Sequence, residues 1–295
     1  MLGRARLARV FSLFSVLCAL LVADRLRADG QFNLTTYNVH SLPEIKVMGI
    51  PIIGNGKNLK TIADRVCDLE ILLIQEDFWQ PELASLGDCY DDILLAPRDL
   101  SLKPKDFIRQ MTKRDDRKRL QSGLSIFSKH NILSHTQIPW QVCSGYTSNA
   151  NDCLSWKGFT HTVIELEPGV VVDVYNLHHD AGKDGTDRDA RFAQTKQLVA
   201  HIKKQSKNNM LIVAGDFNAM TEEPGLNYFR RSLPIREVCP TLKCDDMRID
   251  KVFFRSGNVA KLIPRHIQVY KPTRELSDHE AIYVDFEWMN YPGLD

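Results

Sequence analysis

The chain has 295 residues, of which 43% are hydrophobic and 25% are charged. This balance is typical of a globular protein and excludes a disordered, collagen-like or low-complexity chain. The formal net charge of +1 gives no global electrostatic reason to expect a nucleic-acid-binding protein. The length is sufficient for a hydrophobic core of ordinary size.

The first 28 residues resemble a secretory signal. Arg4, Arg6 and Arg9 precede an apolar run over residues 10–23, which is shorter than the roughly 20 residues that a membrane span needs. We predict a signal peptide over residues 1–28, cleaved after Ala23 or Ala28, and a single domain over 29–295. Loss of this segment, with its five arginines and one aspartate, would change the net charge to −3. The protein is expected to be secreted or periplasmic, or membrane-anchored if the signal is not cleaved.

Six cysteines follow the signal segment, and an even number is typical of disulfides in an exported protein. Proximity in the sequence favours the pairs Cys143–Cys153 and Cys239–Cys244, which leaves Cys67–Cys89. A zinc site is the alternative, but no Cys–His spacing suggests one.

The predicted elements alternate between strands and helices. In chain order they are a strand at 32–37, a helix at 58–69, a strand at 70–75, a strand at 124–128, a hairpin of 159–166 and 170–176, a helix at 187–204, and strands at 210–214, 249–254 and 280–286. Strands mixed with helices, with at least one hairpin, predict two packed sheets with helices outside.

Polar side chains stand at the ends of several of these strands: Asn38, Glu76, Asn176, His178, Asp216, Asn218, Asp250, Asp278 and His279. Taken singly, such a residue is usually a turn or cap residue, and a lone histidine is often part of the core. If the ends converge, they form one pocket of oxygen ligands and two imidazoles. Oxygen ligands suit a hard cation, and a hard cation beside histidines suits metal-assisted displacement at phosphorus.

Six short segments resemble the ordered motifs of the endonuclease/exonuclease/phosphatase (deoxyribonuclease-like) superfamily, and the resemblance covers residues 32–286. They are Thr36-Tyr37-Asn38, Ile74-Gln75-Glu76, Asn176-Leu177-His178, Gly215-Asp216-Phe217-Asn218, Ile249-Asp250 and Ser277-Asp278-His279. The resemblance implies the α/β (α+β) fold of that family, a four-layered sandwich of two packed mixed β-sheets flanked by helices.

The resemblance also implies roles for these residues. Glu76 is the main metal ligand, supported by Asn38 and Asp278, and the metal is Mg²⁺, with Mn²⁺ or Ca²⁺ as alternatives. His279 is the general base, and Asp250 orients it. His178 and Asn218 stabilise the phosphoryl oxygens, and Asn176 belongs to the substrate-binding set. Asp216 either orients the attacking water or binds a second metal.

Residues 143–159, with Lys157-Gly158, are similar to the segment of neutral sphingomyelinases in which a Lys-Gly pair opens a strand. In this reading Lys157 contacts a substrate phosphate, and the alternative is a solvated loop lysine.

The leading hypothesis is therefore a secreted, divalent-metal-dependent phosphodiesterase that cleaves a phospholipid such as sphingomyelin, with a lipid surface as partner. The alternatives are a secreted deoxyribonuclease-like endonuclease, with nucleic acid as partner, and a non-catalytic surface-binding or toxin subunit. No obligate protein partner is evident.

Two further segments bear on the substrate. Residues 47–54 are apolar without clear periodicity, so they either enter a bilayer or pack on the core. Residues 103–119 contain eight Lys or Arg against three Asp. They would attract anionic headgroups or a phosphate backbone, or form an exposed charged loop.

Overall fold

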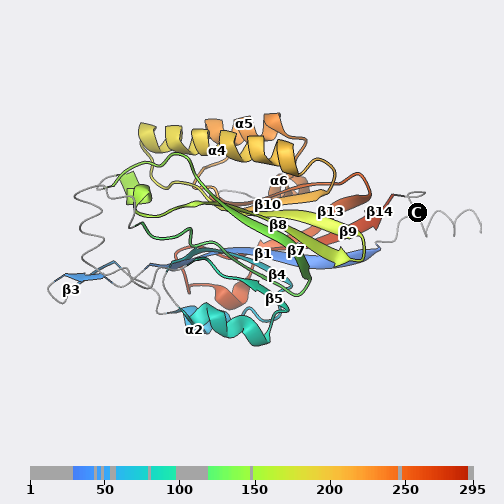
Figure 1. Cartoon of the computed structure of the whole chain (residues 1–295), viewed down its shortest axis with the longest axis horizontal. Coiled ribbons are helices and arrows are strands. Elements are labelled where there is room, and N and C mark those ends of the chain that lie inside the picture. The colour runs from blue at the N-terminus through green and yellow to red at the C-terminus, as the bar shows by residue number, and fades with distance from the viewer. Residues whose placement is uncertain are drawn as a thin grey trace, which may run out of the picture.

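The protein folds as a sandwich of two six-stranded mixed sheets, with helices on both outer faces (Figure 1). The computed structural model describes residues 29–42, 45–47, 50–53, 58–78, 81–97, 119–146, 149–244 and 248–291. The predicted four-layered α/β sandwich is therefore confirmed. The predicted signal peptide and all but Arg119 of the basic segment lie outside the described residues. Within the described part of the chain, no helix has both the length and the apolar character needed to cross a bilayer.

The first sheet has the strand order β13-β14-β1-β4-β6-β5. β1 (Gly30–Ser41) runs parallel to β4 (Ile71–Asp77) and antiparallel to β14 (Ile282–Asn290). The outer strands are β13 (Ala260–Val269), β6 (Ser125–Ser128) and β5 (Asp92–Leu94). The parallel pair brings the carboxyl ends of β1 and β4 to one edge of the sandwich.

The second sheet has the order β11-β12-β10-β9-β8-β7. Its strands are β11 (Arg236–Glu237), β12 (Asp250–Arg255), β10 (Met210–Asp216), β9 (Val170–His178), β8 (Gly158–Glu167) and β7 (Asn131–Pro139). β9 and β10 are parallel, and the helix α4 (Gly185–Gln205) connects them. Both therefore end at the same edge, His178 beside Asp216.

The main core fills the space between the sheets. Leu34 and Leu73 of the first sheet belong to the same fully buried cluster as Val172 and Ile212 of the second. Burial on both faces explains why the central strands read as continuous apolar runs. A buried polar link also joins the sheets, because Gln75 of β4 donates to the side-chain oxygen of Asn176 on β9 at 2.7 Å.

Helices close the two outer faces. α4 and α5 (Pro224–Ser232) cover the second sheet, and α2 (Leu59–Ala63) with the 3-10 helix η2 (Pro81–Asp88) lies against the first (Figure 1). α2 is shorter than the helix predicted over 58–69. The chain leaves the helix after Ala63, and the Val66 carbonyl accepts a hydrogen bond from the Tyr90 hydroxyl at 2.6 Å. Val66 and Leu69 remain buried without being helical.

Several elements were not predicted. β7 is a half-exposed edge strand without apolar alternation, and β13 has Pro264 at a register shift. β2 (Ile45–Val47) and β3 (Ile50–Ile53) pair antiparallel in a segment where an aperiodic loop was expected. The other elements that were not predicted are the short strands β5 and β11, the helices α5 and α6 (Val238–Leu242), and the 3-10 helices η2, η4 (Asn149–Leu154) and η5 (Lys271–Thr273). Such short elements carry too few residues for a periodic signal.

Three disulfides join the cysteines that proximity in the sequence paired: Cys67–Cys89, Cys143–Cys153 and Cys239–Cys244. This confirms the predicted set and removes the zinc alternative for these six residues. Three disulfides fit an oxidising compartment such as the cell exterior.

Candidate active site

The polar residues at the strand ends converge on one edge of the sandwich. Strand register sets the arrangement, because Asp216 at the end of β10 is directly opposite His178 on one side and Asp250 on the other. Asn38 and Glu76 approach from β1 and β4 of the first sheet. The site is therefore built from both sheets. The sequence motifs can form one site only if the ends of these strands meet, and the fold shows that they do.

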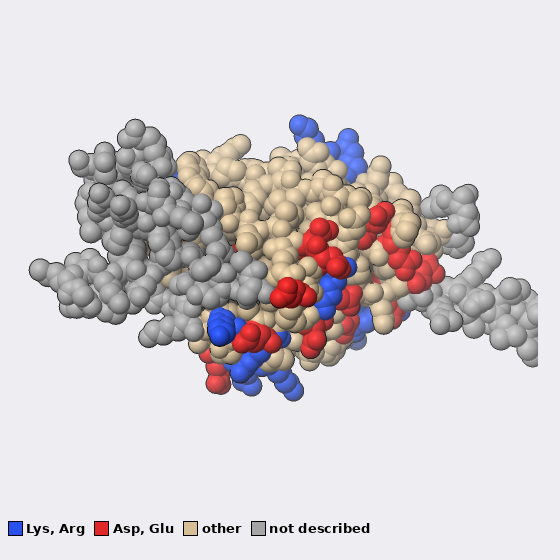
Figure 2. All heavy atoms as spheres, turned by 60° about the horizontal axis from the view of Figure 1, so that its bottom comes forward, with Lys and Arg blue, Asp and Glu red and all other residues tan. Residues whose placement is uncertain are grey.

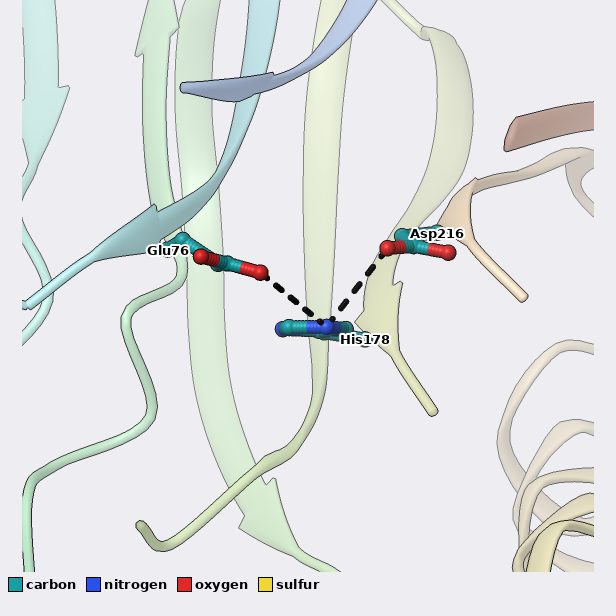
Figure 3. Close-up of side chains that lie close together, drawn as sticks. All are labelled: Glu76, His178 and Asp216. Carbon is teal, nitrogen blue, oxygen red and sulfur yellow. Dashed lines mark ion pairs between the residues drawn. The ribbon is translucent and has the colours of Figure 1, made fainter. Parts of the chain in front are cut away.

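Glu76, His178 and Asp216 form the centre of the site (Figure 3). The Nε2 atom of His178 lies 3.7 Å from Glu76 Oε1 and 3.5 Å from Asp216 Oδ2. His178 and Asp216 are each 1% exposed, whereas the Glu76 side chain is 16% exposed. Glu76 has a left-handed backbone with φ of 60°. That conformation costs roughly 1 kcal/mol or more for a residue with a side chain, and such residues concentrate at functional sites.

Asn38 joins the two carboxylates. Its side-chain nitrogen donates to Glu76 Oε1 at 2.9 Å and to Asp216 Oδ2 at 3.1 Å. Rotation of this amide would present its oxygen to a cation between the carboxylates. One ligand atom each from Glu76, His178 and Asp216 lie within 4.8 Å of one another, so the donor set fits a divalent cation, with the oxygen donors that Mg²⁺ favours.

His279 and Asp250 form a second pair beside the first. The Nδ1 atom of His279 lies 2.7 Å from Asp250 Oδ2, and its Nε2 atom lies 3.8 Å from Asp216 Oδ2. Burial by itself would lower the pKa of His279, but the hydrogen bond and charge of Asp250, with Asp216 and Asp278, raise it to about 9. One imidazole nitrogen is thus fixed by Asp250, and the other faces the carboxylate cluster.

Lys157 completes the row on the other side of His178. Its Nζ atom lies 2.9 Å from His178 Nε2, 2.7 Å from Asp152 Oδ1 and 3.3 Å from the His179 carbonyl oxygen. The side chain is only 10% exposed. Burial acts to lower the pKa of Lys157, but the carboxylates of Asp152, Glu76 and Asp180 outweigh it and raise the pKa. Lys157 is therefore a buried cation at the site, which excludes the solvated loop lysine.

Burial and neighbouring charges shift the pKa values of His178 and Asp216. Burial lowers the pKa of His178 well below its ordinary value, and Lys157 and His279 lower it further. His178 is therefore neutral at pH 7, and its approaches to Glu76 and Asp216 are not ion pairs. Burial, with the charge of Asp250, raises the pKa of Asp216 to about 7. A cation bound between Asp216 and Glu76 would oppose that shift.

The remaining predicted residues divide between the site and its surroundings. Asn218 lies at the rim with φ of 48°, and its amide donates to the His179 carbonyl at 3.0 Å. Asp278, predicted as a metal ligand, is 56% exposed and pairs with His40 Nδ1 at 3.0 Å. It belongs to neither of the two clusters of possible ligands found among the described residues.

Asn176 does not fit its predicted place in the substrate-binding set. Its side chain is completely buried, and its amide nitrogen donates to the carbonyls of Ile74 and Ser125. Its oxygen accepts from Gln75. These bonds use its hydrogen-bonding groups to join the two sheets, so we assign Asn176 a structural role.

Several supporting residues were missed. Asp152, buried in the loop closed by the Cys143–Cys153 disulfide, holds Lys157. Trp140 donates its indole N–H to the His178 carbonyl at 2.8 Å. Asp180 accepts from the Ser144 backbone N–H. Asp152 stands five residues before Lys157. Because residues in a loop have no regular periodicity, this separation does not predict a contact, and only the fold shows the pairing.

The fold and the site define a class of protein. The family model described as Endonuclease/Exonuclease/phosphatase family matches residues 35–279, and the chain belongs to that family.

Relatives found by sequence carry the name sphingomyelinase. Proteins named sphingomyelinase from Mycobacterium bovis and Mycobacterium tuberculosis are 25% identical over 290 residues, a match covering 88% of this chain and 54% of theirs. The chain thus spans about half the length of these relatives.

Solved structures share the fold. Staphylococcus aureus beta toxin, in a mutant form with bound magnesium ions, matches with a TM-score of 0.59 and 17% identity, covering 86% of this chain and 99% of that one. Sphingomyelinase C from Streptomyces griseocarneus matches with a TM-score of 0.58 and 15% identity, covering 87% and 99%.

Proposed function

We propose that the chain is an exported, magnesium-dependent phosphodiesterase that hydrolyses a phospholipid such as sphingomyelin and releases the phosphorylated headgroup. One observation carries the proposal, namely the continuous row His279–Asp216–His178–Lys157 beside the Glu76 carboxylate. A carboxylate-bound imidazole, a cluster of potential metal ligands and a buried ammonium thus lie next to one another, which supports hydrolysis at phosphorus.

The row gives each side chain a task. As the neutral imidazole, His279 takes a proton from water at Nε2, while Asp250 fixes the ring and stabilises the imidazolium that forms. The carboxylates that raise the pKa of His279 to about 9 favour its protonated form, and a cation held by Glu76 and Asp216 would lower that pKa and favour the neutral base. The water oxygen bonds to phosphorus, and the bond from phosphorus to the alcohol oxygen breaks. Neutral His178, the ammonium of Lys157 and the Asn218 amide stabilise the charge on the phosphoryl oxygens and on the departing oxygen. That oxygen takes a proton from solvent, which gives a phosphomonoester and an alcohol.

A divalent cation fits the same arrangement. Glu76 and Asp216 would hold it, with Asn38 after rotation of its amide. When bound, such a cation polarises a phosphoryl oxygen and neutralises negative charge. The bound magnesium in the beta toxin structure supports magnesium as the metal.

Lipid is favoured over DNA as the substrate for two reasons. The mycobacterial relatives are named sphingomyelinases. The Lys157-Gly158 pair, which resembles the Lys-Gly pair of neutral sphingomyelinases, stands at the start of β8 at the site. On the face shown in Figure 2, acidic and basic side chains of the described residues are interspersed. Among the described residues of that face there is no continuous basic strip of the kind that neutralises successive phosphates of DNA.

A paired assay tests the proposal. Protein expressed with its first 28 residues is isolated from the exported fraction and incubated with Mg²⁺ or with EDTA. One arm contains sphingomyelin vesicles and measures phosphocholine release, and the other contains plasmid DNA and measures nicking. We expect magnesium-dependent phosphocholine release and intact plasmid. Nicking without lipid hydrolysis would transfer the function to the nuclease branch, and no activity in either arm would support a non-catalytic role.

A further inference from the structure

A cavity of about 390 Å³ lies beside the row of catalytic side chains, within the size range of small-molecule sites, roughly 300–1,000 Å³. Strands β7 and β8 of the second sheet contribute to it, together with the loops next to β5 and β6 of the first sheet. The apolar lining residues are Pro97, Ile138, Pro139, Trp156 and Phe159, and the polar ones are Gln121, Ser122 and Gln137. None of the assigned tasks uses this cavity.

Chain connections place the cavity next to the reacting groups. Trp156 directly precedes Lys157, whose Nζ atom reaches His178. Ser122 directly precedes Gly123, which packs so closely on the first sheet that a Cβ there would lie 3.2 Å from the Cα of Glu76. The cavity therefore begins where the row of catalytic side chains ends.

Strand order places the cavity opposite the general base. In the second sheet, Asp250 begins β12, and the cavity lies beyond β9 on β8 and β7. In the first sheet, His279 precedes β14, whereas Ser122 and Pro97 flank β6 and β5 at the far side. The strand order of both sheets thus puts the general base His279 at one end of the site and the cavity at the other. Asp216, His178 and Lys157 lie between them in that order.

This direction has a chemical meaning. In an in-line displacement the attacking water and the departing oxygen lie on opposite sides of phosphorus. Water activated by His279 enters at one end of the row, so the departing oxygen leaves at the Lys157 end, at the mouth of the cavity. We propose that the cavity receives the alcohol portion of the substrate, and that it selects phosphodiesters with an apolar leaving group. This inference rests on the proposed function.

The chemistry of the lining fits an apolar group. The described lining residues include no charged side chain. Two of the polar ones bond to each other, because Ser122 donates to Gln137 Oε1 at 2.9 Å, and Gln137 reaches the Leu124 carbonyl at 3.4 Å. Arg119 lies 4.4 Å from the Trp156 ring centroid and braces the indole. The phosphate remains with the charged groups, and the hydrocarbon enters the neutral cavity.

A series of soluble phosphocholine diesters tests the proposal. The alcohol is methyl, butyl or octyl, phosphocholine is the common product, and kcat/KM is measured with Mg²⁺ below the micellar concentration. For the wild type we expect kcat/KM to rise with alcohol length by about tenfold or more, as added methylenes fill a hydrophobic pocket. In Ile138→Trp, which fills the cavity from β7, the rise should disappear while the methyl ester is hydrolysed at the wild-type rate.

Two further variants keep the test decisive. Gln121→Trp fills the cavity from the loop before β6 and should behave like Ile138→Trp, which covers the case in which the latter does not fold. Ser134→Trp adds the same side chain at an exposed position of β7 outside the cavity and should retain the rise. The cavity assignment alone would be overturned if the kcat/KM of the wild type did not depend on alcohol length. It would also be overturned if the Ile138→Trp and Gln121→Trp variants kept that dependence. A wild type that hydrolyses no diester would overturn the proposed function and this inference together.

Discussion

The Nδ1 atom of His279 lies 2.7 Å from Asp250 Oδ2, although the two residues belong to different sheets of the sandwich. Asp250 begins β12 in the second sheet, and His279 stands just before β14 in the first. The base and the carboxylate that orients it therefore meet only when the sheets pack together.

This pairing predicts the effects of two substitutions. His279→Ala should lower kcat by about 10²- to 10⁴-fold, because the attacking water loses its base. Asp250→Asn should lower kcat by a smaller factor, because the ring remains in place but its protonated form is no longer stabilised. Phosphocholine release measures both, and circular dichroism checks the fold. A folded His279→Ala enzyme with near-normal kcat would contradict the assignment.

Glu76 is expected to be the principal carboxylate for the cation. Magnesium at about 100 times its dissociation constant should add about 2.7 kcal/mol of stability to the wild type and raise its Tm, whereas EDTA should reverse the effect. Glu76→Gln should lose both this shift and phosphodiester hydrolysis.

Glu70→Gln is the matched control for this substitution. Glu70 directly precedes β4, where it bonds to Asn33 and His130. The Glu70→Gln variant should keep the magnesium-dependent rise in Tm. An unchanged magnesium shift in Glu76→Gln would place the cation elsewhere.

Lys157 and Asp152 form a buried pair, with side chains 10% and 1% exposed. Lys157→Met leaves the Asp152 carboxylate buried without its cation, so we expect a loss of about 3 kcal/mol in unfolding free energy. The double variant Lys157→Met with Asp152→Asn should recover much of that stability but not the activity. Urea unfolding separates the two effects. Full activity in the double variant would show that the ammonium is not needed for the reaction.

Asn176 should matter for stability rather than for substrate binding. Asn176→Leu removes the bond to Gln75 and leaves the carbonyls of Ile74 and Ser125 without this donor. We expect a loss of about 1–3 kcal/mol on chemical denaturation, from unsatisfied buried polar groups. The KM of the folded fraction should stay at the wild-type value. A raised KM at unchanged stability would restore the substrate-binding role.

The central strands and the long helix were predictable because each contains its own periodic or continuous apolar signal. β4, β10 and α4 are examples, and the helix signal is reinforced by a capping box between Asp184 and Asp187. β7 and β13 escaped prediction because their residues are partly exposed, so the apolar pattern is weak. The helix predicted over 58–69 was too long. The helical spacing of apolar residues continues through Val66 and Leu69, which are buried but lie in a turn after the helix has ended.

The sequence by itself determined the family resemblance and the set of polar residues at strand ends, and it favoured the cysteine pairs that the structure contains. These are properties of local order, namely residue type, spacing and proximity along the chain. Only the tertiary structure decided which of these residues face one another. It brought His279 to Asp250 and Lys157 to His178, turned Asn176 into a link between the sheets, and placed Asp278 beside His40. The reason is physical: a side chain's partners depend on sheet order and on packing between the two sheets, and those relationships join residues that are far apart in the sequence.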